Sequence, residues 1–500
     1  MRAIGLLLCW LAGCATATAG AGVASDPQPT EGPADGLRGL DYTFRIDAGL
    51  SRLSARLCFR GQAPPRLVYG SKPAVLLVRD PQQVSDRGVT LPSPRPLPLV
   101  NDRIELGEMP EDSCVTYEVD VRAAVDGDHL LVAYPCERGV VTSTELFLWR
   151  PQRRAAGLAV TAQFELPEGV RVSVPWRRDP QDARRYLLDE TAFAFIGRAL
   201  FGEFDEQTVD VPSGVITVVS PPGYSDAQRG WIATWLENAG QVVSLPTGHF
   251  PVPQTQAIVL PTSPNPFPIR FGHTGRAGGG SILFFMPTDL DLPSLRDDWI
   301  AVHEFAHLLH PFVRKNDAWL SEGLATYLQE VLRVRAGMLD ANQAWQRMFE
   351  GAKRGRDAEG SLRAETERMP YAHNYERVYW AGAAIVLMAD VELRRRSQGR
   401  HSLDTALAGL RQWPELRLSS IDAAGLLSAL DRATGTTAFR DAAAPFLEGD
   451  ALPDLTKLYR ELGLLDARGG ERVQVRDDAP LAAIRDAIMA PASRVFPLNR

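Results

Sequence analysis

One five-residue pattern constrains this chain more than any other part of its sequence. Residues 303–307 read His-Glu-Phe-Ala-His, so two histidines stand four positions apart with a glutamate beside the first. Four residues of α-helix turn through about 400°, which brings both imidazoles to one face, one turn apart. His303 and His307 can then bind one zinc ion, and the carboxylate of Glu304 flanks that ion without ligating it. The pattern therefore predicts a helix that carries a metal site and a general base.

The surrounding residues predict that this helix is buried, starts near Ser294 and stops at Pro311. Ser294 and Asp297 resemble a capping box, and Asp298 adds an anion to the first turn. Apolar residues recur at spacings of four and three and form a core-facing stripe: Leu295, Trp299, Val302, Ala306 and Leu309. Burying titratable groups on such a helix is costly without a metal or a partner, so we expect a zinc site instead of incidental histidines.

A second helix is expected directly afterwards, and it supplies the third ligand. Residues 316–327 read Asn-Asp-Ala-Trp-Leu-Ser-Glu-Gly-Leu-Ala-Thr-Tyr, and only a short link at 311–315 precedes them. A short link favours antiparallel neighbours. Glu322 then lies at a height similar to that of His307 above the connecting loop, given a rise of ~1.5 Å per residue. Glu322 is the predicted third ligand.

His310 is a rival for the third ligand, because it follows His307 by one turn on the expected metal face. Three ligands on one straight helix are geometrically poor, since the outer two lie about 10 Å apart. We therefore expect His310 beside the site or at its rim.

The two segments together resemble the gluzincin metallopeptidases, the group of aminopeptidase N, leukotriene hydrolase and glycyl aminopeptidase. The motif at 303–307 and the run Asn-Asp-Ala-Trp-Leu-Ser-Glu-Gly-Leu-Ala carry the resemblance. It implies one zinc ion per chain, held by His303, His307 and Glu322, with Glu304 activating a zinc-bound water. The connection between His307 and Glu322 is shorter than in enzymes similar to aminopeptidase N.

A third segment extends this resemblance. Tyr379 and Gly382 match a Tyr-x-x-Gly motif whose tyrosine, in the similar enzymes, donates a hydrogen bond to the developing oxyanion. The alternative is that Tyr379 only packs the start of a helix over 383–393, with Tyr375 or His373 as its substitute.

The stretch 278–285 occupies the place of the family's substrate-aligning edge strand, and an exposed edge can pair with an extended peptide. The alternative is a glycine-rich hinge before a core strand. Aminopeptidases of this group hold the substrate's free amine with a glutamate on that strand, whereas this stretch has no carboxylate and Glu237 is the only glutamate between Val215 and Val302. We expect internal peptide bonds to be accepted at least as well as N-terminal ones.

The expected fold is α+β and multidomain. Alternating polar and apolar residues predict a β-sandwich over 41–212, followed by a thermolysin-like catalytic domain at 213–345 and a helical C-terminal region at 346–500. One disulfide can form among three cysteines, and the sequence leaves the pair open: Cys58, Cys114 and Cys136.

The start of the chain predicts export. Residues 1–13 read as a signal peptide, and Leu-Ala-Gly before Cys14 resembles the lipobox of bacterial lipoproteins. The alternative is an ordinary signal peptide cleaved after Ala19, with Cys14 incidental. Residues 14–40 have the composition of a flexible tether. With alanine at 15, the resemblance implies a lipid anchor in the outer membrane, facing the periplasm.

Composition narrows the function classes. The chain has 54 basic and 61 acidic residues and a net charge of −7, without the basic patch of a nucleic-acid-binding protein. The sequence therefore predicts a zinc metallopeptidase of the cell envelope that acts on peptides or proteins. The alternative is a catalytically inactive lipoprotein that serves as a zinc- or peptide-binding module.

Overall fold

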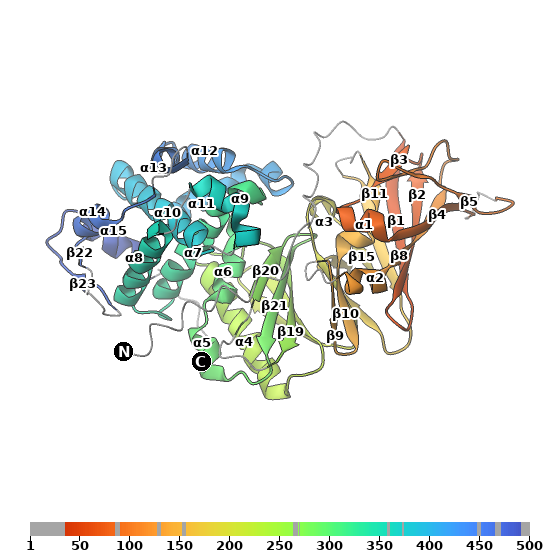
Figure 1. Cartoon of the computed structure of the whole chain (residues 1–500), viewed down its shortest axis with the longest axis horizontal. Helices are drawn as coiled ribbons and strands as arrows, with labels where there is room; N and C mark the ends of the chain where they lie inside the picture. Colours follow the sequence, from red (N-terminus) through yellow and green to blue (C-terminus); the bar gives the residue numbers. More distant parts are fainter. Residues whose placement is uncertain are drawn as a thin grey trace.

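Strands dominate the first part of the structure, 37–202, and helices dominate the last part, 315–489. A mixed part, 205–309, lies between them (Figure 1). The computed structural model describes residues 36–85, 91–127, 132–152, 157–263, 269, 271–357, 361–372, 375–447, 452–465 and 472–491. The predicted signal peptide, Cys14 and His373 lie outside these residues. This order of parts confirms the predicted α+β multidomain architecture.

The first part contains three sheets. The largest has eight strands, which pair in the order β14 (Arg177–Asp179), β15 (Asp182–Leu187), β12 (Ala159–Glu165), β1 (Leu37–Ile46), β2 (Arg52–Gly61), β8 (Cys114–Asp120), β4 (Val78–Val84) and β5 (Arg95–Pro96). A second sheet consists of β13 (Arg171–Ser173), β16 (Arg198–Gly202), β10 (Gly139–Ser143) and β9 (Ala133–Cys136). The third consists of β11 (Arg150–Pro151), β3 (Arg66–Val68), β7 (Arg103–Glu105) and β6 (Leu99–Val100). Three short helices accompany them: α1 (Lys72–Leu77), α2 (Val121–Asp126) and α3 (Glu190–Ala194).

These sheets share one apolar core. Alternate residues of β1 point inward, and the ring of Phe44 lies 4.9 Å from that of Phe147, which in turn lies 6.1 Å from Phe201 of β16. Strand β1 begins at Leu37, within the segment expected to be a tether, and both Leu37 and Leu40 are buried.

The structure settles the cysteine pairing that the sequence left open. Cys58 of β2 and Cys114 of β8 stand directly opposite each other and form a disulfide. Cys136 is a free thiol.

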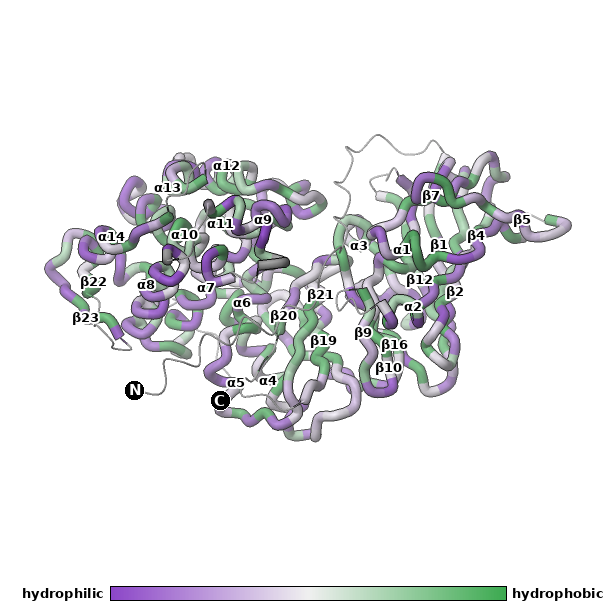
Figure 2. Tube along the Cα trace, viewed as in Figure 1, coloured by the Kyte–Doolittle hydropathy of each residue, from purple (hydrophilic) through white to green (hydrophobic). Residues whose placement is uncertain are grey.

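The middle part is built on a five-stranded sheet in the order β17 (Asp205–Val211), β18 (Gly214–Ser220), β19 (Gln254–Thr262), β21 (Gly280–Pro287) and β20 (Phe271–Gly275). Strands β18, β19 and β21 run parallel, and β20 pairs antiparallel with β21 at the edge. Figure 2 shows hydrophobic residues along much of β19 and β21, and every residue of β21 is buried. Helix α4 (Asp226–Val243) packs against this part.

The prediction that 278–285 forms the edge strand is wrong. Strand β21 has a partner on both sides. Gly278 and Gly279 lie in the turn that joins it to β20, where Gly278 has a φ of 81°, and Gly280 is the first residue of β21. The glycine-rich connection before a core strand, our alternative, is what the structure contains. The edge strand on the side of the zinc motif is β20, which sequence reasoning did not identify; β17 lies at the opposite edge.

The predicted long helix over the zinc motif is divided into three pieces: α5 (Leu292–Asp297), α6 (Ile300–Ala306) and the 3₁₀ turn η4 (His307–Leu309). The backbone of Asp298 is extended and ends α5, and its side chain accepts a hydrogen bond from the Ile300 N–H at 2.7 Å. The predicted capping box is also wrong, because Asp291 caps α5 by accepting from Ser294 N at 2.9 Å.

The last part is helical. After the 3₁₀ turn η5 (Lys315–Asp317), its helices are α7 (Ala318–Arg335), α8 (Ala341–Asp357), α9 (Leu362–Ala372), α10 (Tyr375–Ser397), α11 (Leu403–Gly409), α12 (Ala423–Thr434), α13 (Ala438–Leu447), α14 (Thr456–Glu461) and α15 (Ala482–Met489). A two-stranded ribbon, β22 (Leu464–Leu465) and β23 (Gln474–Val475), lies between the last two. Helix α10 thus starts well before the predicted 383. In the part of the chain that the structure describes, no helix has the length and apolarity needed to cross a bilayer.

Helices α7 and α10 meet through two glycines. A Cβ placed on Gly382 would overlap the carbonyl oxygen of Trp319 and lie 2.9 Å from Cα of Gly323. This close approach is important for the site because α7 carries Glu322 and α10 carries Tyr379.

We therefore expect Gly382→Ala to lower the free energy of unfolding by about 1–3 kcal/mol, because the added methyl group forces α7 and α10 apart. Denaturant unfolding measures this change. Gly230→Ala in α4 is the matched control: no atom lies within 4 Å of its Cβ position, so alanine there should be neutral or stabilising by up to about 1 kcal/mol. Equal stabilities of the two variants would contradict the close contact.

Candidate metal centre

Three elements bring the predicted ligands together. Helix α6 carries His303, η4 carries His307 and α7 carries Glu322. Nε2 of His303 lies 3.2 Å from Oε2 of Glu322, and Nε2 of His307 lies 3.5 Å from the same oxygen. The three ligand atoms all fall within 4.8 Å of one another. Two imidazole nitrogens and a carboxylate oxygen at one point are a donor set typical of zinc.

The other nitrogen of each imidazole has its own partner. Nδ1 of His303 lies 2.8 Å from Oε1 of Gln329, and Nδ1 of His307 lies 3.0 Å from the hydroxyl of Ser321. Gln329 is itself held by Glu330, which accepts from its amide at 3.1 Å. These contacts occupy the Nδ1 atoms, so the Nε2 atoms remain available for a metal.

Sequence reasoning missed Gln329. It follows Glu322 by seven residues, which is two turns of α7, and therefore lies on the same face of the helix. That spacing is the signal that could have identified it.

His310 lies beside the site, as expected, and outside the three-residue ligand group. Its Nδ1 is 2.7 Å from the carbonyl oxygen of Pro311, and its Nε2 is 3.5 Å from the hydroxyl of Ser321. Ser321 thus stands between His310 and His307. Burial keeps the pKa of His310 well below its usual value, so its imidazole is neutral.

Glu304 is almost fully buried next to the two histidines. Burial raises the pKa of Glu304, although His307 and His303 oppose the rise. Thr274 of the edge strand β20 donates from its hydroxyl to Oε2 of Glu304 at 2.7 Å. A buried carboxylate with a raised pKa is suited to accept and release a proton.

Tyr379 completes the group on the side of α10. Its ring stacks on that of His303, with centroids 5.7 Å apart and planes within 11°. Burial, together with the nearby carboxylates of Glu322 and Glu304, raises the pKa of Tyr379 well above its ordinary value. The phenol is therefore neutral and able to donate. The ring centroid of Tyr375, its predicted substitute, lies 6.1 Å from that of Tyr379.

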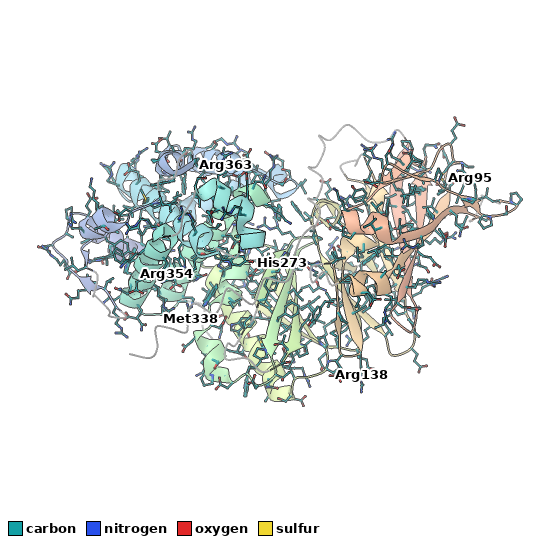
Figure 3. The ribbon with its side chains drawn as sticks, viewed as in Figure 1. Arg95, Arg138, His273, Met338, Arg354 and Arg363 are labelled. Carbon is teal, nitrogen blue, oxygen red and sulfur yellow. A yellow bond between two sulfur atoms is a disulfide. The ribbon has the colours of Figure 1, made fainter. Side chains whose placement is uncertain are left out.

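Strand β20 carries a histidine, and an arginine follows it directly. His273 lies in β20, and Figure 3 labels it between the helical part and the β-rich part. Burial, then Arg198, His307 and Lys315, lower the pKa of His273 to about 3. Arg276, which directly follows β20, donates to the carbonyl oxygens of His307 and His310 and so anchors the end of the zinc motif to the sheet.

No family model matches this chain, and no curated protein matches it. Solved structures do. An aminopeptidase N family protein from Idiomarina loihiensis aligns with a TM-score of 0.62 and 14% identity, over 85% of this chain and 78% of its own. An M1 zinc metallopeptidase from Deinococcus radiodurans aligns with a TM-score of 0.53 and 16% identity, over 87% of this chain and 99% of its own. A mutant of that enzyme bound to a Tyr-Ser-Ala substrate aligns with a TM-score of 0.54 and 15% identity, over 87% of this chain and 99% of its own. At these identities the likeness concerns the fold, and at that level the predicted resemblance to aminopeptidase N is confirmed.

Proposed function

We propose that this protein is a zinc-dependent peptidase that hydrolyses peptide bonds in the bacterial cell envelope. The observation that carries the proposal is the convergence of His303, His307 and Glu322 on one point, with the buried carboxylate of Glu304 beside them. The fold shared with M1 zinc metallopeptidases supports it. The mixed part then acts as a thermolysin-like catalytic domain, and the β-rich part as a sandwich that flanks it.

The chain's own residues divide the chemistry among them. Zinc held by the three ligands would polarise both a water molecule and the substrate carbonyl. Glu304 takes a proton from the attacking water and later passes it to the leaving amine. Tyr379, as a neutral phenol, donates a hydrogen bond to the oxyanion that develops on the carbonyl oxygen.

Two glutamate variants separate metal binding from catalysis. Glu322→Ala should lose most of its zinc, because only two imidazoles remain. Glu304→Gln should keep zinc and fold but lose about 10²- to 10⁴-fold in kcat, since an amide cannot accept the proton. Elemental analysis and turnover of casein or mixed peptides give the two readouts. A wild-type protein that binds zinc but has no activity would favour the inactive binding module.

Tyr379→Phe should lower kcat by about 10²- to 10³-fold and change KM little, because its hydrogen bond forms mainly in the transition state. Steady-state kinetics with a peptide substrate separate the two constants. An unchanged kcat would return Tyr379 to a packing role and direct attention to Tyr375.

The edge strand also bears on where the enzyme cuts. Residues 271–275 read Phe-Gly-His-Thr-Gly, so no carboxylate on β20 can pair with a free α-amine. A buried ammonium without a carboxylate partner binds poorly. We therefore propose that internal peptide bonds are substrates.

The matching measurement compares kcat/KM for a peptide with a free N-terminus and for its N-acetylated twin. We expect the acetylated peptide to be cleaved at least as fast. A strong preference for the free amine would contradict this and would point to a carboxylate elsewhere that reaches the centre.

We propose further that the protein is a lipoprotein attached through Cys14, on the evidence of the lipobox-like sequence. Cys14→Ser should move the protein from the membrane fraction to the soluble fraction. Fractionation and mass spectrometry of the mature N-terminus test this, and a wild-type protein without lipid would disprove it.

A further inference from the structure

Strand β20 lies against the zinc helix, and two of its residues face Glu304. Gly272 and Thr274 are two positions apart, so they share one face of the strand. The contacts of these two residues determine how the proposed general base is held.

Thr274 reaches Glu304 at two atoms. Its hydroxyl oxygen lies 2.7 Å from Oε2 of the carboxylate and 2.9 Å from the backbone carbonyl oxygen of the same residue. A hydroxyl has one proton and two lone pairs. It can donate to the ionised carboxylate, or donate to the carbonyl while it accepts from the protonated acid. Thr274 can therefore hold Glu304 before and after the proton is taken up.

Gly272 lies close to the same side chain, near the other carboxylate oxygen. A Cβ at this position would lie 2.6 Å from Oε1, 2.7 Å from Cγ and 2.8 Å from Cδ of Glu304. The φ of Gly272 is not in the left-handed region, so the need for glycine is one of space and not of backbone conformation. Any larger residue would displace the carboxylate.

We propose that Thr274 is a positioning residue for the reaction, and that it and Gly272 form a support on β20 that orients Glu304 for proton transfer. This inference rests on the proposed peptidase function. It assigns the edge strand a part in catalysis that does not depend on contact with substrate.

Thr274→Val keeps the shape of the side chain and removes the hydroxyl. We expect kcat to fall about 10- to 100-fold, the range for loss of a hydrogen bond to a charged group, with KM within about twofold of the wild type. Zinc content should be unchanged. Thr274→Ser should recover most of the activity, because it restores the hydroxyl.

Thr255→Val is the matched control. Thr255 lies in β19 of the same sheet and is buried, and its hydroxyl has no hydrogen-bond partner among the described residues. The same substitution there should leave kcat unchanged. Gly272→Ala is a second probe of the support and should lower kcat with zinc retained.

The effect of Thr274 must pass through Glu304. In a Glu304→Gln background, Thr274→Val should cause little further loss, so the double variant should be about as active as Glu304→Gln alone. Full additivity, an unchanged kcat in Thr274→Val, or no recovery in Thr274→Ser would overturn the proposal.

A structural readout separates this proposal from the peptidase function itself. Crystal structures of the zinc-loaded wild type and Thr274→Val should show the Glu304 carboxylate shifted or in several conformations in the variant only. If the wild type is inactive but this shift occurs, the proposed function fails and the support stands. If the wild type is active and Glu304 does not move in the variant, the support fails.

Discussion

Burial of two imidazoles beside a carboxylate is the constraint that the rest of this structure has to satisfy. The side chains of His303, His307 and Glu322 are withdrawn from water at a single point. Burial alone would raise the pKa of Glu322, but the His307 and His303 rings lower it below its ordinary value, so the group is ionised. Such an arrangement is stable only when every polar atom in it has a partner or a metal.

Three surrounding elements supply these contacts: α7, α10 and β20. Gln329 and Ser321, on α7 itself, take the two Nδ1 atoms. Tyr379 covers the centre from α10, and Thr274 contacts Glu304 from β20. The glycine contact between α7 and α10 and the arginine that joins β20 to the end of the zinc motif hold these elements at fixed spacing. The centre is therefore a product of packing across elements far apart in sequence.

The β-rich part also contributes to the position of β20. The amide of Gly278, in the turn after β20, donates to the hydroxyl of Thr191 at 2.9 Å. The amide of Arg276 donates to the carbonyl oxygen of Ile196 at 3.1 Å, and the amide of Arg198 to the hydroxyl of Ser281 at 2.9 Å. These bonds join the first part of the chain to the hairpin that carries Thr274, so the edge strand is fixed from both sides.

The sequence by itself determined the ligand set that we propose, because an i, i+4 histidine pair and a following Glu-Gly helix encode their geometry within short segments. It also predicted the order of strands and helices along the chain. Tertiary structure alone decided which strand forms the sheet edge, since residues 271–275 are too short and too rich in glycine to show an alternating pattern. It likewise decided the break at Asp298, the Cys58–Cys114 pair and the contact of Thr274 with Glu304. Each of these features depends on which distant segment packs alongside, and the periodicity of a short segment does not determine that.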